Sequence, residues 1–229
     1  MTQRTYEQNC GLALSLDVLG ERWTLLIIRE LNLGPKRFGD LAGRLPGIAT
    51  NILAARLKSL EAHDVLRRTT LPPPANVAAY ELTPHGEALQ PMLDGLALWG
   101  FRYLPDGAAD RTTRVSWAAL SMRAVYQQDP DPTLHLVMNL HVDDEQLVIR
   151  INGLDADVHH GTTRHDALNA TTNLETFLAI ASGTLPVRRA INRGDLHIDT
   201  DPAPVERLFA RFRLPTVETP NLPATADRP

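Results

Sequence analysis

The sequence predicts two domains of different classes, a mainly helical N-terminal half that contains one β-hairpin and an α+β C-terminal half. Up to residue 104 the apolar residues recur with the period of a helix, whereas after residue 133 they alternate as in strands. Between these patterns, the segment PDGAADRTTR at residues 105–114 is rich in Pro, Gly, Asp and small residues, which is typical of a linker. The 229 residues are enough to bury two separate cores.

Four short helices are expected before the hairpin. Their apolar stripes are Leu12, Leu16 and Leu19; Trp23, Leu26, Ile27 and Leu31; Phe38, Leu41 and Leu45; and Leu53, Leu57 and Leu60. Gly20 ends the first helix, Leu33-Gly34-Pro35 closes the second, and Pro46-Gly47 turns the chain between the third and the fourth. Two helices joined by a tight turn indicate a helix-turn-helix.

A β-hairpin and a closing helix follow. Two β-prone segments, 65–70 and 77–83, are joined by a turn with three prolines at its tip, Pro72-Pro73-Pro74-Ala75-Asn76. Thr83 and Pro84 then supply an N-cap and a first-turn proline for one helix. The apolar residues of that helix are Leu89, Leu93, Leu96 and Tyr103. This order of helices, recognition helix, wing and closing helix predicts a winged helix-turn-helix domain over residues 1–104.

The second half has the pattern of an α+β domain. Alternating apolar residues predict a hairpin of two strands, 134–142 and 147–151, joined by the turn Asp143-Asp144-Glu145-Gln146. Asn173 is expected to cap a helix that Gly183 ends. The remaining elements are expected to be strands at 154–158, 166–172 and 196–198, and helices at 115–127, 174–181, 186–192 and 205–212. The domain is expected to span residues 115–214, and the Pro- and Thr-rich tail 215–229 to be disordered.

The first domain resembles the HxlR-type regulators, which are winged-helix relatives of the MarR group. The family pattern runs from a cysteine through Gly-x-(Lys/Arg)-Trp, Phe-x-x-Leu, Ile-Ser and Leu-x-x-(Arg)-Leu-x-x-Leu to Leu-Thr-x-x-Gly. This sequence matches it at Cys10, Gly20-Glu21-Arg22-Trp23, Phe38-Gly39-Asp40-Leu41, Ile48-Ala49, Leu53-Ala54-Ala55-Arg56-Leu57-Lys58-Ser59-Leu60 and Leu82-Thr83-Pro84-His85-Gly86. The resemblance covers nearly all of residues 10–90 and implies a DNA-binding transcriptional regulator. It also implies a homodimer, built from the first helix and the helix after the wing, whose two recognition helices reach successive major grooves of double-stranded DNA.

Two residues depart from the family pattern. Ala49 stands where a serine usually caps the recognition helix, so Thr50 is expected to take over the cap. Asp64 stands where a glycine usually ends that helix. Because Asp tolerates the left-handed conformation better than most residues, the turn is expected to survive.

Polar residues in and around the recognition helix are the candidate DNA contacts. Thr50 and Asn51 lie at the start of the helix, and an asparagine side chain is suited to adenine. The candidates for phosphate contacts are Lys36, Arg37, Arg56 and Lys58, with Arg67 and Arg68 at the root of the wing. Each of these cations could equally be a solvated charge, and Arg56 could pair with Glu30 or Glu61.

Cys10, the one cysteine, admits two interpretations. The family has a cysteine at this position that senses oxidants or electrophiles in some members, and a helix N-terminus lowers the pKa of a thiol. Alternatively, Cys10 is a small buried hydrophobe. Without a second cysteine in the chain, a disulfide of Cys10 could only link two subunits or join a small thiol.

The second domain resembles the sterol-carrier-protein-like domain that is fused to some HxlR-type regulators. The resemblance rests on the segment NATTNLETFLAIASGTLPVRRAINRGDLHIDTDPAPVERL, and mainly on Ala190-Ile191-Asn192-Arg193-Gly194, Leu196-His197-Ile198 and Asp201-Pro202. In that fold an antiparallel sheet and its helices can enclose an apolar tunnel for a lipid-like molecule. Six side chains are candidates either for lining a ligand pocket or for filling the core: Trp117, Leu120, Met138, Phe177, Phe209 and Phe212.

Other classes of protein lack their signatures. No Gly-x-Ser-x-Gly, Walker or Gly-x-Gly-x-x-Gly motif occurs, so neither enzyme activity nor a cofactor is expected. His159, His160 and His165 are clustered, but adjacent histidines of an extended chain face different ways, which disfavours a shared metal. No apolar run approaches the roughly 20 residues of a membrane span, and no signal core begins the chain. A cytoplasmic protein that does not contact membranes is expected.

The charge distribution assigns a nucleic-acid partner to the first half. Residues 1–104 hold 11 Lys and Arg against 10 Asp and Glu, a net of +1, whereas residues 105–229 hold 12 against 17, a net of −5. The sequence therefore predicts a dimeric DNA-binding regulator whose second domain senses a lipophilic molecule or only stabilises the protein. The alternative is a lipid or acyl carrier that uses the helical half only to dimerise. Salt-dependent binding to duplex DNA separates the two functions.

Overall fold

The computed structural model describes residues 5–103, 112–164 and 166–211. The chain divides into two compact units between Leu93 and Asp94, within helix α6 (Gln90–Gly100). Most of the predicted linker, the tail 215–229 and Phe212 lie outside the described residues.

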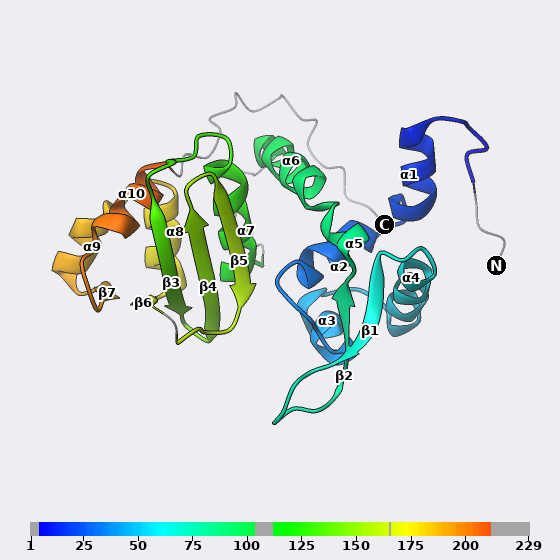
Figure 1. The fold of residues 1–229 in the computed structure, drawn as a ribbon, viewed down its shortest axis with the longest axis horizontal. Coiled ribbons are helices and arrows are strands. Elements are labelled where there is room, and N and C mark those ends of the chain that lie inside the picture. The colour runs from blue at the N-terminus through cyan, green and yellow to red at the C-terminus, as the bar shows by residue number, and fades with distance from the viewer. Residues whose placement is uncertain (1–4, 104–111, 165, 212–229) are drawn as a thin grey trace, which may run out of the picture. The chain divides into compact units, whose positions relative to one another are not determined.

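The N-terminal unit has the order of elements of a winged helix (Figure 1), as the sequence predicts. Its helices are α1 (Gly11–Leu19), α2 (Thr24–Leu31), α3 (Phe38–Arg44), α4 (Thr50–Ala62) and α5 (Pro84–Glu87). The wing is an antiparallel pair of strands, β1 (Leu66–Thr70) and β2 (Ala78–Leu82). Lys36 and Tyr80 extend this sheet, because each backbone N–H donates to the other's carbonyl, at 2.9 and 2.8 Å.

The helix after the wing is broken, although the sequence predicts it as one piece. Helix α5 ends at Glu87, α6 begins at Gln90, and a 3₁₀ turn at Phe101–Tyr103 follows. Pro91 accounts for the break, because it has no N–H to donate to the carbonyl of Glu87 four residues earlier.

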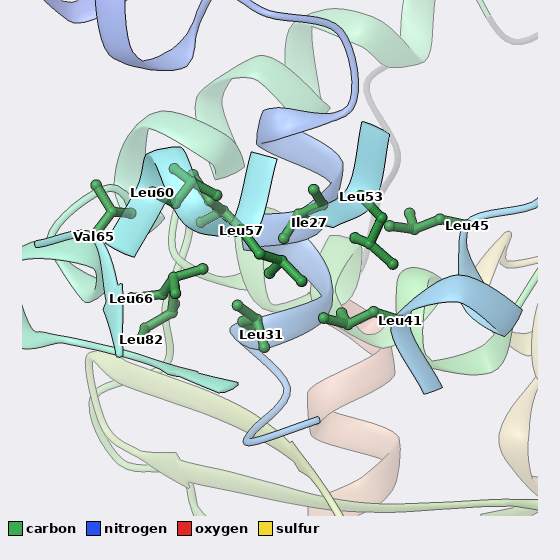
Figure 2. Close-up of a cluster of buried hydrophobic side chains, with 11 residues drawn as sticks. Ile27, Leu31, Leu41, Leu45, Leu53, Leu57, Leu60, Val65, Leu66 and Leu82 are labelled. Atoms are coloured by element: carbon green, nitrogen blue, oxygen red, sulfur yellow. The ribbon is translucent and has the colours of Figure 1, made fainter. Parts of the chain in front are cut away.

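The leucine row of α4 lies at the centre of the N-terminal core (Figure 2). Leu53, Leu57 and Leu60 are fully buried among apolar side chains of α2, α3 and the wing. These neighbours are Ile27, Ile28, Leu31, Leu41, Leu45, Val65, Leu66 and Leu82. Burial of one such side chain is worth about 1.5–3 kcal/mol. The cluster therefore fixes which face of α4 points inward and which is left to solvent.

The Leu-Thr-x-x-Gly motif joins the wing to α5. The Thr83 hydroxyl accepts a hydrogen bond from the amide of Gly86 at 3.1 Å and donates one to the carbonyl of Asp64. A Cβ at Gly86 would lie 2.0 Å from the carbonyl oxygen of Val65. Since no side chain can occupy that space, the glycine of the motif is required by packing.

The two departures from the family pattern have different outcomes. Asp64 has a φ of 56°, the left-handed conformation that the sequence predicts there. The predicted cap is wrong, because Ala49 is the N-cap residue of α4, no side chain caps it, and Thr50 is the first residue of the helix. The side chain of Thr50 is exposed at the start of α4.

The second unit has the predicted α+β class. Its helices after α6 are α7 (Val115–Tyr126), α8 (Leu174–Ala181), α9 (Val187–Arg193) and α10 (Ala203–Arg211). Its strands are β3 (His135–Val142), β4 (Glu145–Asn152), β5 (Asp155–His160), β6 (Leu168–Thr172) and β7 (Leu196–Ile198). They form one sheet in the order β5-β4-β3-β6-β7, in which β3 and β6 are parallel and all other neighbours antiparallel. Helices α7, α8 and α10 lie on one face of this sheet (Figure 1).

Local signals set the boundaries of these elements. The β3–β4 turn is shorter than predicted, because Asp143 adopts a φ of 50° and Val142 already pairs with Glu145. The predicted cap of α8 is confirmed, since the side chain of Asn173 accepts from the amide of Thr176 at 2.8 Å. In the described parts of the chain, every helix is too short or too polar to cross a membrane.

Candidate nucleic-acid interface

Helices α3 and α4 are held in a fixed helix-turn-helix. Gly47 turns the chain between them with a φ of 89°. Glu30 of α2 is buried, and its carboxylate accepts from Arg44 of α3 at 2.9 Å and from Arg29 at 2.9 Å. This pairing anchors α3 on α2, so the start of α4 has a defined position.

The exposed face of α4 carries a row of polar and very small side chains. Asn51, Ala54, Ala55 and Lys58 are all exposed and lie opposite the buried leucines. Residues spaced by three, four and seven positions share one face of a helix, so the two alanines lie between Asn51 and Lys58. Sequence reasoning did not single out Ala54 and Ala55, although this spacing marks them. Because an alanine side chain ends at Cβ, this face lets the helix backbone approach a surface closely.

Arg56 does not belong to that row. Its guanidinium lies 3.4 Å from the carboxylate of Glu21, which precedes α2, and both residues border an open groove between α1 and α4. The expected pairing of Arg56 with Glu30 or Glu61 was wrong. Glu30 binds Arg29 and Arg44, and Glu61 lies 3.3 Å from Arg68.

The two cations before α3 differ in exposure. Lys36 is only 6% exposed, and its ammonium donates to the carbonyl of Gly34 at 3.4 Å. The structure thus does not put Lys36 on the surface where a phosphate contact was expected. Arg37 is exposed, and its backbone N–H donates to Asp40 at the start of α3.

The wing presents two exposed arginines at its root. Arg67 donates to Glu81 across the hairpin at 2.7 Å. Arg68 lies near Glu61 and over the ring of Tyr80, 5.9 Å from the ring centroid. Exposed ion pairs contribute about 0–1 kcal/mol, so these arginines can exchange a carboxylate for a phosphate at little cost.

Large apolar side chains are exposed on α1 and α6. They are Leu12, Leu14 and Leu16 on the first helix and Met92, Leu96 and Trp99 on the second. Exposed contiguous apolar surface marks interaction sites in soluble proteins. The two helices that family resemblance assigns to the dimer thus carry three such residues each, whereas α2 and α4 expose one each, Leu26 and Ile52.

Cys10 is exposed in the single chain, so its interpretation as a buried hydrophobe is wrong. It stands at the N-cap position of α1. The backbone amides of Ala13 and Leu12 lower the pKa of its thiol.

The candidate pocket residues of the second unit mostly fill its core. Leu120, Met138 and Phe177 are buried, whereas Trp117 and Phe209 are half-buried. Phe177 and Phe209 meet edge to face, with ring centroids 6.3 Å apart. A cavity of about 10 Å³ lies between α7 and the sheet, room for about one water molecule. It is bordered by other residues, among them Met122, Arg123 and Tyr126.

The clustered histidines do not assemble a metal site in the described part of the chain, where no three His, Cys, Asp or Glu side chains gather. Burial opposes ionisation of Asp157, but a 2.6 Å contact with His159 lowers its pKa overall. His165 lies outside the described residues.

A helix-turn-helix with a small-residue face, followed by a two-stranded wing, defines a DNA-binding winged helix. The HxlR-like helix-turn-helix family model matches residues 18–108. Three curated relatives are similar to this chain over alignments of comparable length. The regulator YodB of Bacillus subtilis is 37% identical over 41% of this chain and 83% of its own length. The uncharacterized regulator YvaP, also of B. subtilis, is 32% identical over 42% of this chain and 89% of its own length. The uncharacterized regulator sll1512 of Synechocystis is 35% identical over 42% and 70%.

A solved structure of quinone-bound YodB from B. subtilis has 35% sequence identity to this chain. It covers 41% of this chain and 98% of its own, with a TM-score of 0.36. The relatives named above are all HTH-type transcriptional regulators. The chain belongs to the HxlR-like helix-turn-helix family, and it is a DNA-binding transcriptional regulator of the HxlR/MarR type.

Proposed function

We propose that the protein acts as a homodimer that inserts α4 into the major groove of operator DNA. The observation that carries this proposal is the exposed row Asn51, Ala54, Ala55 and Lys58, opposite leucines that cannot turn outward. The amide of Asn51 can pair bidentately with adenine, and the hydroxyl of Thr50 can bond to a base edge. The alanines leave room for that approach.

Phosphate contacts come from the cations that surround this row. Lys58 follows Asn51 on the same face of α4, Arg37 precedes α3 at its N-cap position, and Arg67 and Arg68 lie at the wing root. These four side chains are exposed, and Coulomb attraction to phosphate fixes the position of the protein without reading sequence. Arg56 and Lys36 are instead assigned structural roles, because one pairs with Glu21 and the other is buried.

The test compares three alanine variants of α4 in a gel-shift titration at several salt concentrations. Asn51→Ala should lower operator affinity by about 1–3 kcal/mol with little effect on non-specific DNA. Lys58→Ala should weaken all DNA and reduce the salt slope by about one. Arg56→Ala is the matched control, a lost cation on the same helix, and should keep the wild-type slope. Wild-type affinity and slope in both Asn51→Ala and Lys58→Ala would refute the assignment of α4.

The dimer is assigned to α1 and α6. Their exposed leucines, Met92 and Trp99 would be covered by the same helices of a second copy. A two-fold arrangement lets two copies of α4 reach half-sites one helical turn apart, about 34 Å along DNA. We place this complex in the cytoplasm, where one exposed cysteine stays reduced.

Cys10 is proposed as a thiol that reports oxidants to this dimer. It is exposed beside the leucines of α1, and its pKa is lowered. A two-electron oxidant such as diamide would oxidise two thiols, Cys10 and either its copy in the second subunit or a small thiol, to one disulfide. Diamide should change operator affinity of the wild type but not of Cys10→Ser. Equal responses of both proteins would exclude Cys10.

The second unit is proposed to be sterol-carrier-like and to answer to a lipophilic molecule. Its helices cover one face of a five-stranded sheet. A lipophilic molecule would enter between α7 and the strands. Native mass spectrometry of the purified protein tests this, because a bound lipid adds a defined mass. If none is retained and added fatty acids leave operator affinity unchanged, the unit only stabilises the protein. If salt-dependent DNA binding is absent while a lipid is retained, the carrier function replaces the regulator.

A further inference from the structure

Two consecutive residues of α6 are fixed by different units. Leu93 packs, with Leu89, against the N-terminal core. Asp94 accepts a hydrogen bond at 2.7 Å from the guanidinium of Arg123, in the middle of α7. The side chain of Arg123 is 2% exposed and that of Asp94 is 12% exposed, so the ion pair is almost fully removed from water.

Stability alone does not account for this ion pair. Only one oxygen of Asp94 is hydrogen bonded, and its Oδ2 is buried with no hydrogen-bond partner. Burial raises the pKa of Asp94, even though the charge and the hydrogen bond of Arg123 act in the opposite direction. Desolvation therefore outweighs the attraction. Buried pairs of this kind are often replaced by apolar residues of similar volume without loss of stability.

An ion pair nevertheless differs from an apolar contact in specificity. Two apolar side chains tolerate sliding and rotation, whereas a buried charge is satisfied in one register only. Asp94 lies about 140–160° around the helix from Met92, Leu96 and Trp99, at 100° per residue. The pair thus holds α6 from the side opposite to the exposed apolar residues.

We propose that the Asp94–Arg123 pair is a clasp by which the C-terminal unit sets the rotation and register of α6, and through α6 the geometry of the DNA-binding dimer. The inference rests on the proposed function in one respect, that α6 belongs to the dimer interface. It gives the C-terminal unit a role that needs no bound ligand. A change in the packing of α7 on its sheet would be transmitted to α6 through this pair.

The test replaces the clasp with an apolar pair in the full chain, Asp94→Leu with Arg123→Met. We expect an unchanged or higher thermal midpoint, because the desolvated charges are gone. Amide hydrogen exchange in α6 should nevertheless accelerate about tenfold, since the helix is no longer held in one register. Operator affinity should fall about tenfold, within the usual range of coupling between sites.

The matched control makes the same exchange at a surface pair of the same unit, Asp129→Leu with Arg211→Met. That pair is exposed, with a 2.7 Å contact, and its loss should leave α6 exchange and operator affinity as in the wild type. Wild-type exchange in α6 of the Asp94→Leu/Arg123→Met protein would overturn the clasp. Hydrogen exchange decides this even if the wild type shows no salt-dependent DNA binding, an outcome that would sink only the proposed function.

A milder variant covers failure of the double variant to fold. Asp94→Asn keeps an acceptor for Arg123 and removes the charge. It should accelerate α6 exchange relative to the wild type at equal secondary structure by circular dichroism. Unchanged exchange in Asp94→Asn would also overturn the clasp.

Discussion

The winged-helix part and the α+β part bury their apolar residues to different extents. Among the described residues, α1 and α6 expose six large apolar side chains between them, whereas the chain after residue 112 exposes one, Leu154. In the second part the alternating residues of β3, β4 and β5 are buried under α7 and its neighbouring helices. A single chain thus buries nearly all the large apolar side chains of the second part.

The two parts therefore differ in how much apolar surface they leave for a partner to cover. The core around α4 is closed by a few leucines and isoleucines, and the helices at its margins are left half-covered. A small core of this kind would gain from association, because a second copy would cover the apolar surface that one chain leaves exposed. Among the described residues after 112, Leu154 is the one large apolar side chain that is exposed, so we expect any influence of this part on DNA binding to pass along the chain through α6.

The largest effect is expected in the core of the α+β unit. Phe177→Ala should destabilise the α+β unit by about 3–5 kcal/mol, because Phe177 is 1% exposed and its removal leaves a cavity. Calorimetry should show a lowered transition for this unit alone. Phe209→Ala, at the half-buried partner ring, should cost less. A change below about 1 kcal/mol for Phe177→Ala would mean that its side chain borders open space, as a ligand pocket requires.

A smaller effect is expected at the proposed dimer interface. Trp99→Asp should weaken dimerisation about 100-fold, or about 2.7 kcal/mol, because a charge would be buried at the interface. Leu154→Asp is the matched control, since Leu154 is 62% exposed and Trp99 53%. Sedimentation velocity over a dilution series measures both. Equal dimer affinity of the two variants would remove α6 from the interface.

The sequence predicted the fold well because its signals are local. Leucine periodicity located α4, and Thr83 and Asn173 marked the starts of α5 and α8 as side-chain caps. The break at Pro91 was also readable, since a proline within a helix removes a hydrogen bond, but the apolar pattern that continues across it favoured one helix.

The candidate site was less predictable because side-chain direction and pairing depend on tertiary contacts. Lys36 and Arg56 look like surface cations in the sequence, yet one is buried beside Gly34 and the other turns to Glu21, 35 residues away. No local pattern brings Asp94 to Arg123 either. Exposure of Cys10 was not readable for the same reason.

The smallest expected effect concerns the stability of the α+β unit at low pH. Asp131 precedes β3 and binds Arg207 of α10, whose Nη2 lies 2.6 Å from its carboxylate, and the Thr133 hydroxyl at 2.7 Å. These partners hold the pKa of Asp131 well below its usual value. Because the folded pKa is the lower one, the stabilisation is present above about pH 4 and is lost as pH falls towards the folded pKa.

Asp131→Asn should therefore flatten the pH dependence of the α+β transition below about pH 4 and slightly lower its midpoint at neutral pH. Thermal scans between neutral pH and about pH 2 measure this. Asp144→Asn, at an exposed turn residue of the same unit, serves as the control. The unfolding transition of the N-terminal unit should have the same pH dependence in both variants, because Asp131 lies in the α+β unit. If Asp131→Asn kept the full wild-type pH dependence, the ion pair between Asp131 and Arg207 would contribute nothing to the stability of the α+β unit. Another contact would then have to hold α10 against the sheet.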